Sequence, residues 1–170
     1  MCSTDKTALT RQVHSIPPVY DETSRILILG SFPSVKSRET AFFYGHPQNR
    51  FWKVTAAVFR APVPERIEEK RAFLLTHHIA VWDVVASCEI VGSSDSSIRA
   101  VEPNDLSDIL AAAPVRRIFT NGAAAGRLYE KYLLPRTGIP ATVLPSTSPA
   151  NAAWSLERLI GAWRRLLASE

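Results

Sequence analysis

The chain has 170 residues, which suits one domain, and a domain of this size buries roughly 70% of the surface of its unfolded chain. Its formal charge of +4 permits an anionic partner but proves none, because scattered basic residues fit a solvated surface equally well. No apolar run reaches the roughly 20 residues of a membrane span, and Cys2 and Cys88 match neither a disulfide framework nor a paired metal-ligand spacing. We therefore expect a protein of the reducing cytoplasm with no membrane segment, metal or cofactor. We also expect a monomer.

The first 24 residues are polar and contain Pro17-Pro18, which predicts a loosely held N-terminal lead-in over 1–24 and a single domain over 25–170. Four aliphatic runs follow that are too short for typical helices. Each run predicts a buried strand of one parallel sheet. The runs are Arg25–Gly30, Ile79–Val85, Val115–Thr120 and Ala141–Leu144.

Helical patterns lie between and after these runs. The clearest is the last, because its apolar residues recur near a 3.6-residue period with arginines between them. Strands that alternate with helices predict a three-layer α/β/α sandwich around a central, mainly parallel four-stranded sheet. The active site of such a sheet lies beyond the carboxyl ends of its strands, so the loops after the four runs are the ones to inspect. The expected helices cover residues 50–59, 65–77, 105–113, 123–134 and 152–167.

The loop after the first strand begins with Gly30-Ser-Phe-Pro-Ser34, in which a glycine and a proline turn let backbone amides approach a ligand closely. Three consecutive aromatic residues, Phe42–Tyr44, then precede Gly45–Asn49. So many aromatic and amide groups in one loop must either fold inward as core or receive something flat and polar. A nucleobase has both properties.

Two further segments are rich in small hydroxyl groups. Ser146, Thr147 and Ser148 precede the last helix, where they could cap its N-terminus beside amides that attract phosphate, or form an ordinary helix start. The second segment, Ser87–Ser97, is expected as a loop that contributes to a base pocket, binds backbone phosphate or is a solvated turn.

These segments resemble the signature motifs of the uracil-DNA glycosylase superfamily in order and spacing over most of the chain. Gly30–Ser34 stands at the place of the first motif, Leu144–Ala152 at that of the second, and Val81–Val85 at that of the strand end that carries a base-reading side chain. His46–Val54 (HPQNRFWKV) is similar to the run in the mismatch-specific uracil/thymine branch. The hypoxanthine-DNA glycosylase branch is the one that four segments together resemble most, namely Gly30–Pro33, Phe43-Tyr44-Gly45, Ser93–Ser96 and Leu144–Asn151.

The resemblance implies a catalyst that differs from most of the superfamily. The first motif usually carries an Asp or Asn that positions the hydrolytic water, whereas Phe32 stands there in this chain. The resemblance to this branch implies that a downstream asparagine takes that role, and the matching residue is Asn49. Tyr44 matches an aromatic that stacks on the flipped base, with a core or rim tyrosine as the alternative. Asp83 stands where relatives carry a base-reading Asn, with a helix-capping or salt-bridged aspartate as the alternative.

The residues expected in the site fall into three groups. Asn49 is expected to be catalytic, by orienting a water against a sugar carbon that carries oxocarbenium-like charge. The base pocket is expected to contain Gly30, Ser31, Phe32, Tyr44 and Asp83. DNA contacts are expected from Pro33, Ser34, Arg50, Lys53, Ser146, Thr147, Ser148, Pro149, Ala150 and Asn151.

Three functions fit this reading. The favoured one is a monofunctional glycosylase that removes hypoxanthine from DNA containing this deaminated base. A uracil- or mismatch-directed glycosylase on the same fold differs from it in base choice alone. A damaged-DNA-binding or small-molecule-binding module that has lost catalysis is the third, because Phe32 replaces the usual polar residue and a fold does not guarantee a function.

Overall fold

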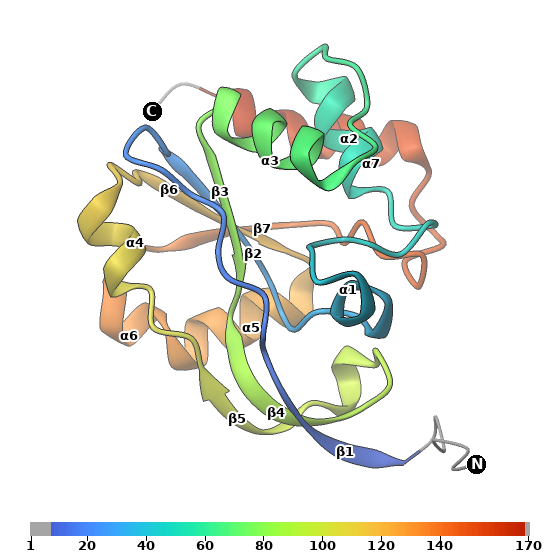
Figure 1. Ribbon diagram of the computed structural model, residues 1–170, viewed down its shortest axis with the longest axis vertical. Helices are drawn as coiled ribbons and strands as arrows, with labels where there is room; N and C mark the ends of the chain where they lie inside the picture. The colour runs from blue at the N-terminus through green and yellow to red at the C-terminus, as the bar shows by residue number, and fades with distance from the viewer. Residues whose placement is uncertain (1–7, 169–170) are drawn as a thin grey trace.

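The structure is a computed structural model that describes residues 8–168, and four parallel strands form its central sheet (Figure 1). The strand order is β3-β2-β6-β7, as predicted for one parallel sheet, and each strand coincides closely with an expected aliphatic run. Gly30 pairs with Asp83 and Asn121 with Leu144, so all four strands end at one edge. The strands are β2 (Ile26–Gly30), β3 (Ile79–Asp83), β6 (Arg117–Asn121) and β7 (Ala141–Leu144).

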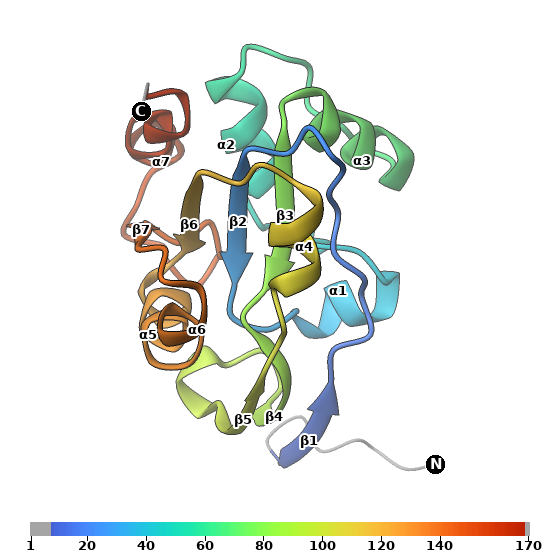
Figure 2. The ribbon, with the colours of Figure 1, turned by 90° about the vertical axis from the view of Figure 1, so that its left-hand side faces the viewer.

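Helices cover both faces of this sheet, which confirms the predicted three-layer α/β class. Side chains alternate between the faces of a strand, so Ile28 joins the core under α2, α3 and α7 while Leu27 and Leu29 join the core under α4 and α5. Figure 2 shows β6, β2 and β3 side by side between these layers. The helices are α2 (Phe51–Val58), α3 (Ile67–Thr76), α4 (Ser107–Ala112), α5 (Ala123–Tyr132) and α7 (Leu156–Trp163).

A second, antiparallel sheet was not predicted. It contains β1 (Leu9–Val13), β4 (Val85–Val91) and β5 (Arg99–Pro103), with β4 in the middle. The expectation of one strand over Ile79–Val85 was wrong at its end, because β3 stops at Asp83 and Val85 already belongs to β4. The expectation of a loop over Ser87–Ser97 was wrong up to Val91. A turn and the short 3-10 helix η1 (Asp95–Ser97) follow.

The described part of the expected lead-in is built into the fold. β1 pairs with β4 along its whole length, and Val19 forms an antiparallel bridge with Val81 of the central sheet. Ile16 and Val19 are buried in the core. Residues 8–24 therefore connect the two sheets, and residues 1–7 lie outside the described residues.

The last two expected helices differ most from the observed ones. The last begins at Leu156, because the Ser155 hydroxyl accepts from Arg158 N at 3.2 Å and caps it; the interpretation of Ser146, Thr147 and Ser148 as its cap was wrong. The expected helix over 123–134 divides into α5 and α6 (Leu134–Thr137), which has proline near its start. The remaining elements are α1 (Val35–Thr40) and η2 (Arg164–Leu167). No helix within residues 8–168 has the length and apolar character to cross a membrane.

Candidate functional site

A cavity of about 320 Å³ lies at the edge where the parallel strands end. This is the position expected for the site of an open α/β sheet. Its wall contains many of the residues expected from the sequence, namely Gly30, Ser31, Phe32, Pro33, Ser34, Tyr44, Asn49, Asp83, Ser146, Thr147, Ser148, Pro149 and Ala150. Arg50, Lys53 and Asn151 are not part of this wall.

Asn49 lies in the cavity wall with its amide held by the protein. Its Oδ1 accepts from the backbone N–H of Phe51 and from the Thr147 hydroxyl, each at 2.9 Å. Asn121 braces Thr147, since Asn121 Nδ2 donates to Thr147 Oγ1 at 2.9 Å and Thr147 N donates to Asn121 Oδ1 at 3.0 Å. A backbone N–H can only donate, so it identifies the Asn49 oxygen, and both lone pairs of that oxygen are in use. Asn49 therefore offers a ligand its Nδ2 donor group.

Tyr44 contributes a protonated hydroxyl to the cavity. Its ring stacks on Phe51 with centroids 4.0 Å apart and 16° between planes, and Tyr44 lines the cavity. The buried hydroxyl makes no well-formed hydrogen bond within residues 8–168. Burial raises the pKa of the Tyr44 phenol, and the negative charge of Asp83 adds to the rise while Asn121 opposes it. Tyr44 thus remains a donor throughout the physiological pH range.

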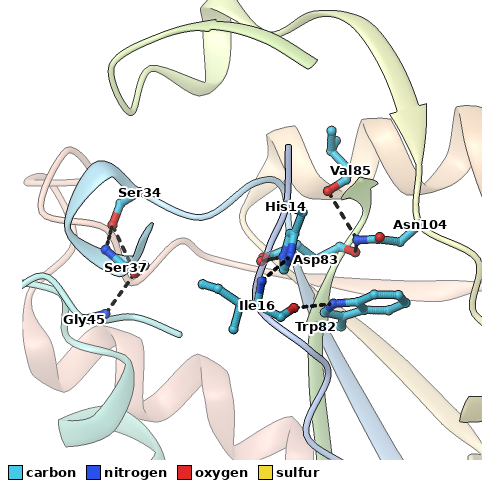
Figure 3. Close-up of polar contacts among 9 residues, drawn as sticks. All are labelled: His14, Ile16, Ser34, Ser37, Gly45, Trp82, Asp83, Val85 and Asn104. Atoms are coloured by element: carbon cyan, nitrogen blue, oxygen red, sulfur yellow. Dashed lines mark hydrogen bonds and ion pairs between the residues drawn. The ribbon is translucent and has the colours of Figure 1, made fainter. Parts of the chain in front are cut away.

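Asp83 is the last residue of β3, and its carboxylate lies between His14 and Gly30. Its Oδ2 is 2.8 Å from Nε2 of His14, and both side chains are almost completely buried (Figure 3). Its Oδ1 lies over Gly30, where an added Cβ would come within 2.3 Å of Oδ1 and 3.2 Å of the Tyr44 hydroxyl oxygen. Glycine is required there for space, because the Asp83 acceptor and the Tyr44 donor both lie close to the position that a Cβ would occupy.

Asp95 places a second carboxylate at the cavity. As a residue of η1 it is exposed at the rim, but its carboxylate faces inward and accepts from the Ser31 hydroxyl at 3.2 Å. Burial raises the pKa of Asp95 to about 6, against the lowering effect of that hydrogen bond, and the charge of Asp83 raises it further. Asp95 therefore titrates near physiological pH.

The segment Ser146–Asn151 forms a tight loop at the mouth of the cavity. Ser148 N donates to Ser146 Oγ at 3.1 Å, Ala150 N donates to Ser148 Oγ at 3.2 Å, and Asn151 Nδ2 donates to Ser146 O at 3.0 Å. Pro149 and Ala150 are exposed. Hydrogen bonds within the loop thus hold a turn that exposes two apolar residues.

Arg50 holds this loop from the side of α2. Its guanidinium donates to the carbonyl of Ser148 at 3.3 Å, to that of Asn151 at 3.0 Å and to that of Trp154. Lys53, one turn further along α2, is exposed. Arg50 thus fixes loop geometry, whereas Lys53 leaves its side chain in solvent.

The first motif is tied to the aromatic loop through α1. The Ser34 hydroxyl caps α1 by accepting from Ser37 N at 3.1 Å, and the Ser37 hydroxyl accepts from Gly45 N at 3.0 Å (Figure 3). Pro33 is buried beside this helix. These bonds set the position of Tyr44 relative to Gly30.

Several wall residues were not among those expected for the site: Ser37, Phe43, His46, Ser93, Asp95 and Asn121. Asn121 ends β6, so the strand-end rule that pointed to Asp83 could also have found it. Ser93 and Asp95 fall in the hydroxyl-rich segment for which a role in the base pocket was one alternative. Nothing in the sequence paired His14 with Asp83. Within residues 8–168 no three His, Cys, Asp or Glu side chains are placed to hold a metal ion.

Comparison with known proteins gives consistent matches. Residues 17–167 match the family model described as uracil DNA glycosylase superfamily. A hypoxanthine DNA glycosylase of Methanosarcina acetivorans is 40% identical over 144 residues, which cover 84% of this chain and 90% of the relative. One of Methanosarcina barkeri is 33% identical over 137 residues, 79% of this chain and 85% of the relative. The solution NMR structure of a proposed uracil DNA glycosylase of M. acetivorans superposes with a TM-score of 0.76 at 35% identity, covering 94% of this chain and 100% of that one.

Proposed function

Because the chain belongs to the uracil DNA glycosylase superfamily, we propose that it is a monofunctional DNA glycosylase that hydrolyses the bond between deoxyribose and a deaminated base, with hypoxanthine as the preferred base. The two relatives named hypoxanthine DNA glycosylase support this choice. We further propose that it acts on DNA in the cytoplasm as a monomer without cofactor.

The observation that carries the proposal is the donor–acceptor pair at Gly30. Hypoxanthine presents a ring N–H beside a carbonyl, so Asp83 Oδ1 can accept from the N–H while the Tyr44 hydroxyl donates to the carbonyl. A cavity of about 320 Å³ lies within the range of small-molecule sites, about 300–1,000 Å³, and suits a two-ring base. To reach it, the nucleotide must leave the duplex, which costs a few kcal/mol and least at a weakened pair.

The bond that breaks joins the base nitrogen to C1′ of the sugar. The electron pair leaves with the base, while positive charge develops on the sugar. The Tyr44 donor stabilises the negative charge on the base carbonyl, and the flanking DNA phosphates stabilise the cation. The departing base then takes up a proton.

Asn49 supplies the second half of the reaction by holding the water. Its Nδ2 group donates to one lone pair of a water, and the second lone pair attacks C1′. An oxocarbenium-like carbon needs no strong base to activate its nucleophile. The fixed amide of Asn49 therefore replaces the polar residue that Phe32 displaces, and the released water proton passes to solvent.

DNA contacts are proposed around the mouth of the cavity. Ser146 and Ser148 are placed to meet phosphates, and Pro149 and Ala150 to enter the minor groove beside the flipped nucleotide. Lys53 adds a phosphate contact from α2. Thr147 is buried with its polar groups engaged, so we assign it to supporting Asn49.

The test is single-turnover cleavage of duplexes with one deoxyinosine or one deoxyuridine, scored by alkali cleavage of the abasic product. We expect deoxyinosine to be cut, and Asn49→Ala to lower the rate about 10²-fold or more, the effect of losing one preorganised polar group. DNA affinity of that variant should persist. Gln48→Ala is the matched control, because Gln48 is exposed in the same loop and is not part of the cavity wall.

Each other outcome has a defined meaning. Preferential cleavage of deoxyuridine would show that uracil, and not hypoxanthine, is the preferred base. Binding of a damaged duplex with no cleavage of either substrate would leave a non-catalytic module and overturn the enzyme. Full activity of Asn49→Ala would show that Asn49 is not the catalytic residue.

A further inference from the structure

His14 lies between β1 and β2 and reaches the underside of the cavity through Asp83. Its Nε2 is 2.8 Å from Asp83 Oδ2, and the two side chains are 1% and 5% exposed (Figure 3). His14 is not part of the cavity wall, so any effect on a ligand must act through Asp83.

The surroundings of His14 determine which ring nitrogen carries the proton. Nδ1 accepts from the backbone N–H of Ile16 at 3.2 Å, so the proton of a neutral ring is on Nε2 and points at Asp83. The backbone of Ile16 is itself held, because Trp82 Nε1 donates to its carbonyl at 3.1 Å. The tautomer is therefore set by Ile16 and Trp82, which are not part of the cavity wall.

The ring of His14 is also fixed in orientation. Phe32 and Trp82 pack edge-on against it with centroids 6.0 and 6.1 Å away, and Phe43 lies 6.2 Å away. His14 N donates to the carbonyl of Ala86 at 2.7 Å, which anchors its backbone to β4. The imidazole cannot turn without moving this aromatic packing.

These contacts determine which oxygen of Asp83 faces the cavity as a hydrogen-bond acceptor. Oδ2 accepts from His14, and Asn104 Nδ2 holds the strand end by donating to the carbonyls of Asp83 and Val85 at 2.9 and 3.2 Å. Oδ1 is then left facing Gly30. A ring N–H opposite this oxygen forms a hydrogen bond, whereas an unprotonated ring nitrogen meets another acceptor and loses one.

We infer that His14 is a positioning residue that keeps Asp83 as a hydrogen-bond acceptor and thereby makes the site select bases with a lactam N–H over aminopurines. Hypoxanthine carries this N–H, and adenine has an unprotonated nitrogen at the same place. The inference rests on the proposed function, since it names the chemistry that the same site recognises.

The test uses free bases and the full chain, so it does not depend on turnover. Calorimetric titration with hypoxanthine, N1-methylhypoxanthine and adenine compares the wild type with His14→Phe and His14→Gln. We expect the wild type to bind hypoxanthine about tenfold or more tighter than either other base, the value of one buried hydrogen bond. His14→Phe should lose most of this preference, and His14→Gln, which retains a side-chain N–H, should regain it.

Several results would overturn the inference. One is an unchanged base preference in His14→Phe; another is equal impairment of both variants in step with their thermal unfolding midpoints, which indicates a structural role alone. If His14→Phe does not fold, the nitrogen NMR spectrum of wild-type His14 decides instead: a proton on Nε2 supports the inference and a proton on Nδ1 refutes it.

The inference and the proposed function fail separately. A wild type that cuts neither duplex but prefers hypoxanthine through His14 would refute the glycosylase and keep the role of His14. If the wild type cuts deoxyinosine while His14→Phe keeps the base preference, the glycosylase stands and the role of His14 is refuted.

Discussion

The Thr147 hydroxyl donates to Asn49 Oδ1 at 2.9 Å across a separation of 98 residues. This bond joins the two motif segments, and Asn121 at the end of β6 holds Thr147 in place. The proposed catalyst is therefore oriented by the second motif and not by its own loop alone.

Thr147→Val should lower the single-turnover rate on deoxyinosine DNA about tenfold with little change in DNA affinity, because a freed Asn49 amide no longer presents Nδ2 in one direction. Thr147→Ser is the control, since it retains the hydroxyl and should stay close to the wild-type rate. Equal rates for Thr147→Val and Thr147→Ser would show that the hydrogen bond from Thr147 to Asn49 does not matter to catalysis.

Gly30→Ala should strongly impair base recognition while leaving the fold intact. The added Cβ would come within 2.3 Å of Asp83 Oδ1, and that carboxylate is held from behind by His14. We expect kcat/KM to fall about 10²-fold. Gly161→Ala in α7 is the control, because nothing lies within 4 Å of its added Cβ; it should keep activity and gain about 0.5–1 kcal/mol of stability. Near-normal activity of Gly30→Ala would show that Asp83 can move without loss.

Asp95 should give the reaction a pH dependence. Its pKa is about 6, so above that pH its negative charge opposes the negative charge that develops on the departing base. We expect kcat/KM to decline as pH rises through about 6, and Asp95→Asn to remove this step and raise neutral-pH activity about fivefold, roughly the 1 kcal/mol of a screened charge. Asp108→Asn, on α4 and outside the cavity wall, is the control.

The same shift predicts the sign of an effect on stability. The folded-state pKa of Asp95 lies above the ordinary 3.8, so its stabilising contribution is fully present below about pH 3.8 and is lost as pH rises through about 6. Asp95→Asn should remove that part of the pH dependence of unfolding. A pH–rate profile of Asp95→Asn that parallels the wild type would assign the titration to another group.

Arg50→Lys should destabilise the chain by about 1–2 kcal/mol, because the single ammonium nitrogen of lysine cannot span the three carbonyls in the loop 148–154 that the wide guanidinium fork of Arg50 reaches. Thermal unfolding measures this. Lys53→Ala on the same helix should instead leave stability unchanged and lower the slope of log K against log salt by about 0.9, the value for one phosphate contact. A full salt-slope effect of Arg50→Lys with no loss of stability would make Arg50 a phosphate ligand.

The sequence by itself determined the central sheet and the sheet edge at which the candidate cavity lies. Continuous aliphatic runs such as Ile26–Gly30 are readable because a strand buried on both faces needs apolar residues throughout. Parallel strands end at one edge, so the loops after Gly30, Asp83 and Leu144 had to meet there, whatever the details of packing.

The tertiary structure alone decided the second sheet and the direction of each polar group. β1 (LTRQV) has a mostly exposed and weakly alternating pattern, and it becomes a strand because β4, some 80 residues away, supplies its hydrogen bonds. Whether Asn49 presents an oxygen or a nitrogen, and whether Asp83 accepts or donates, depends on Thr147 and His14. Those partners are set by sheet register across long stretches of chain, and local sequence carries no record of it.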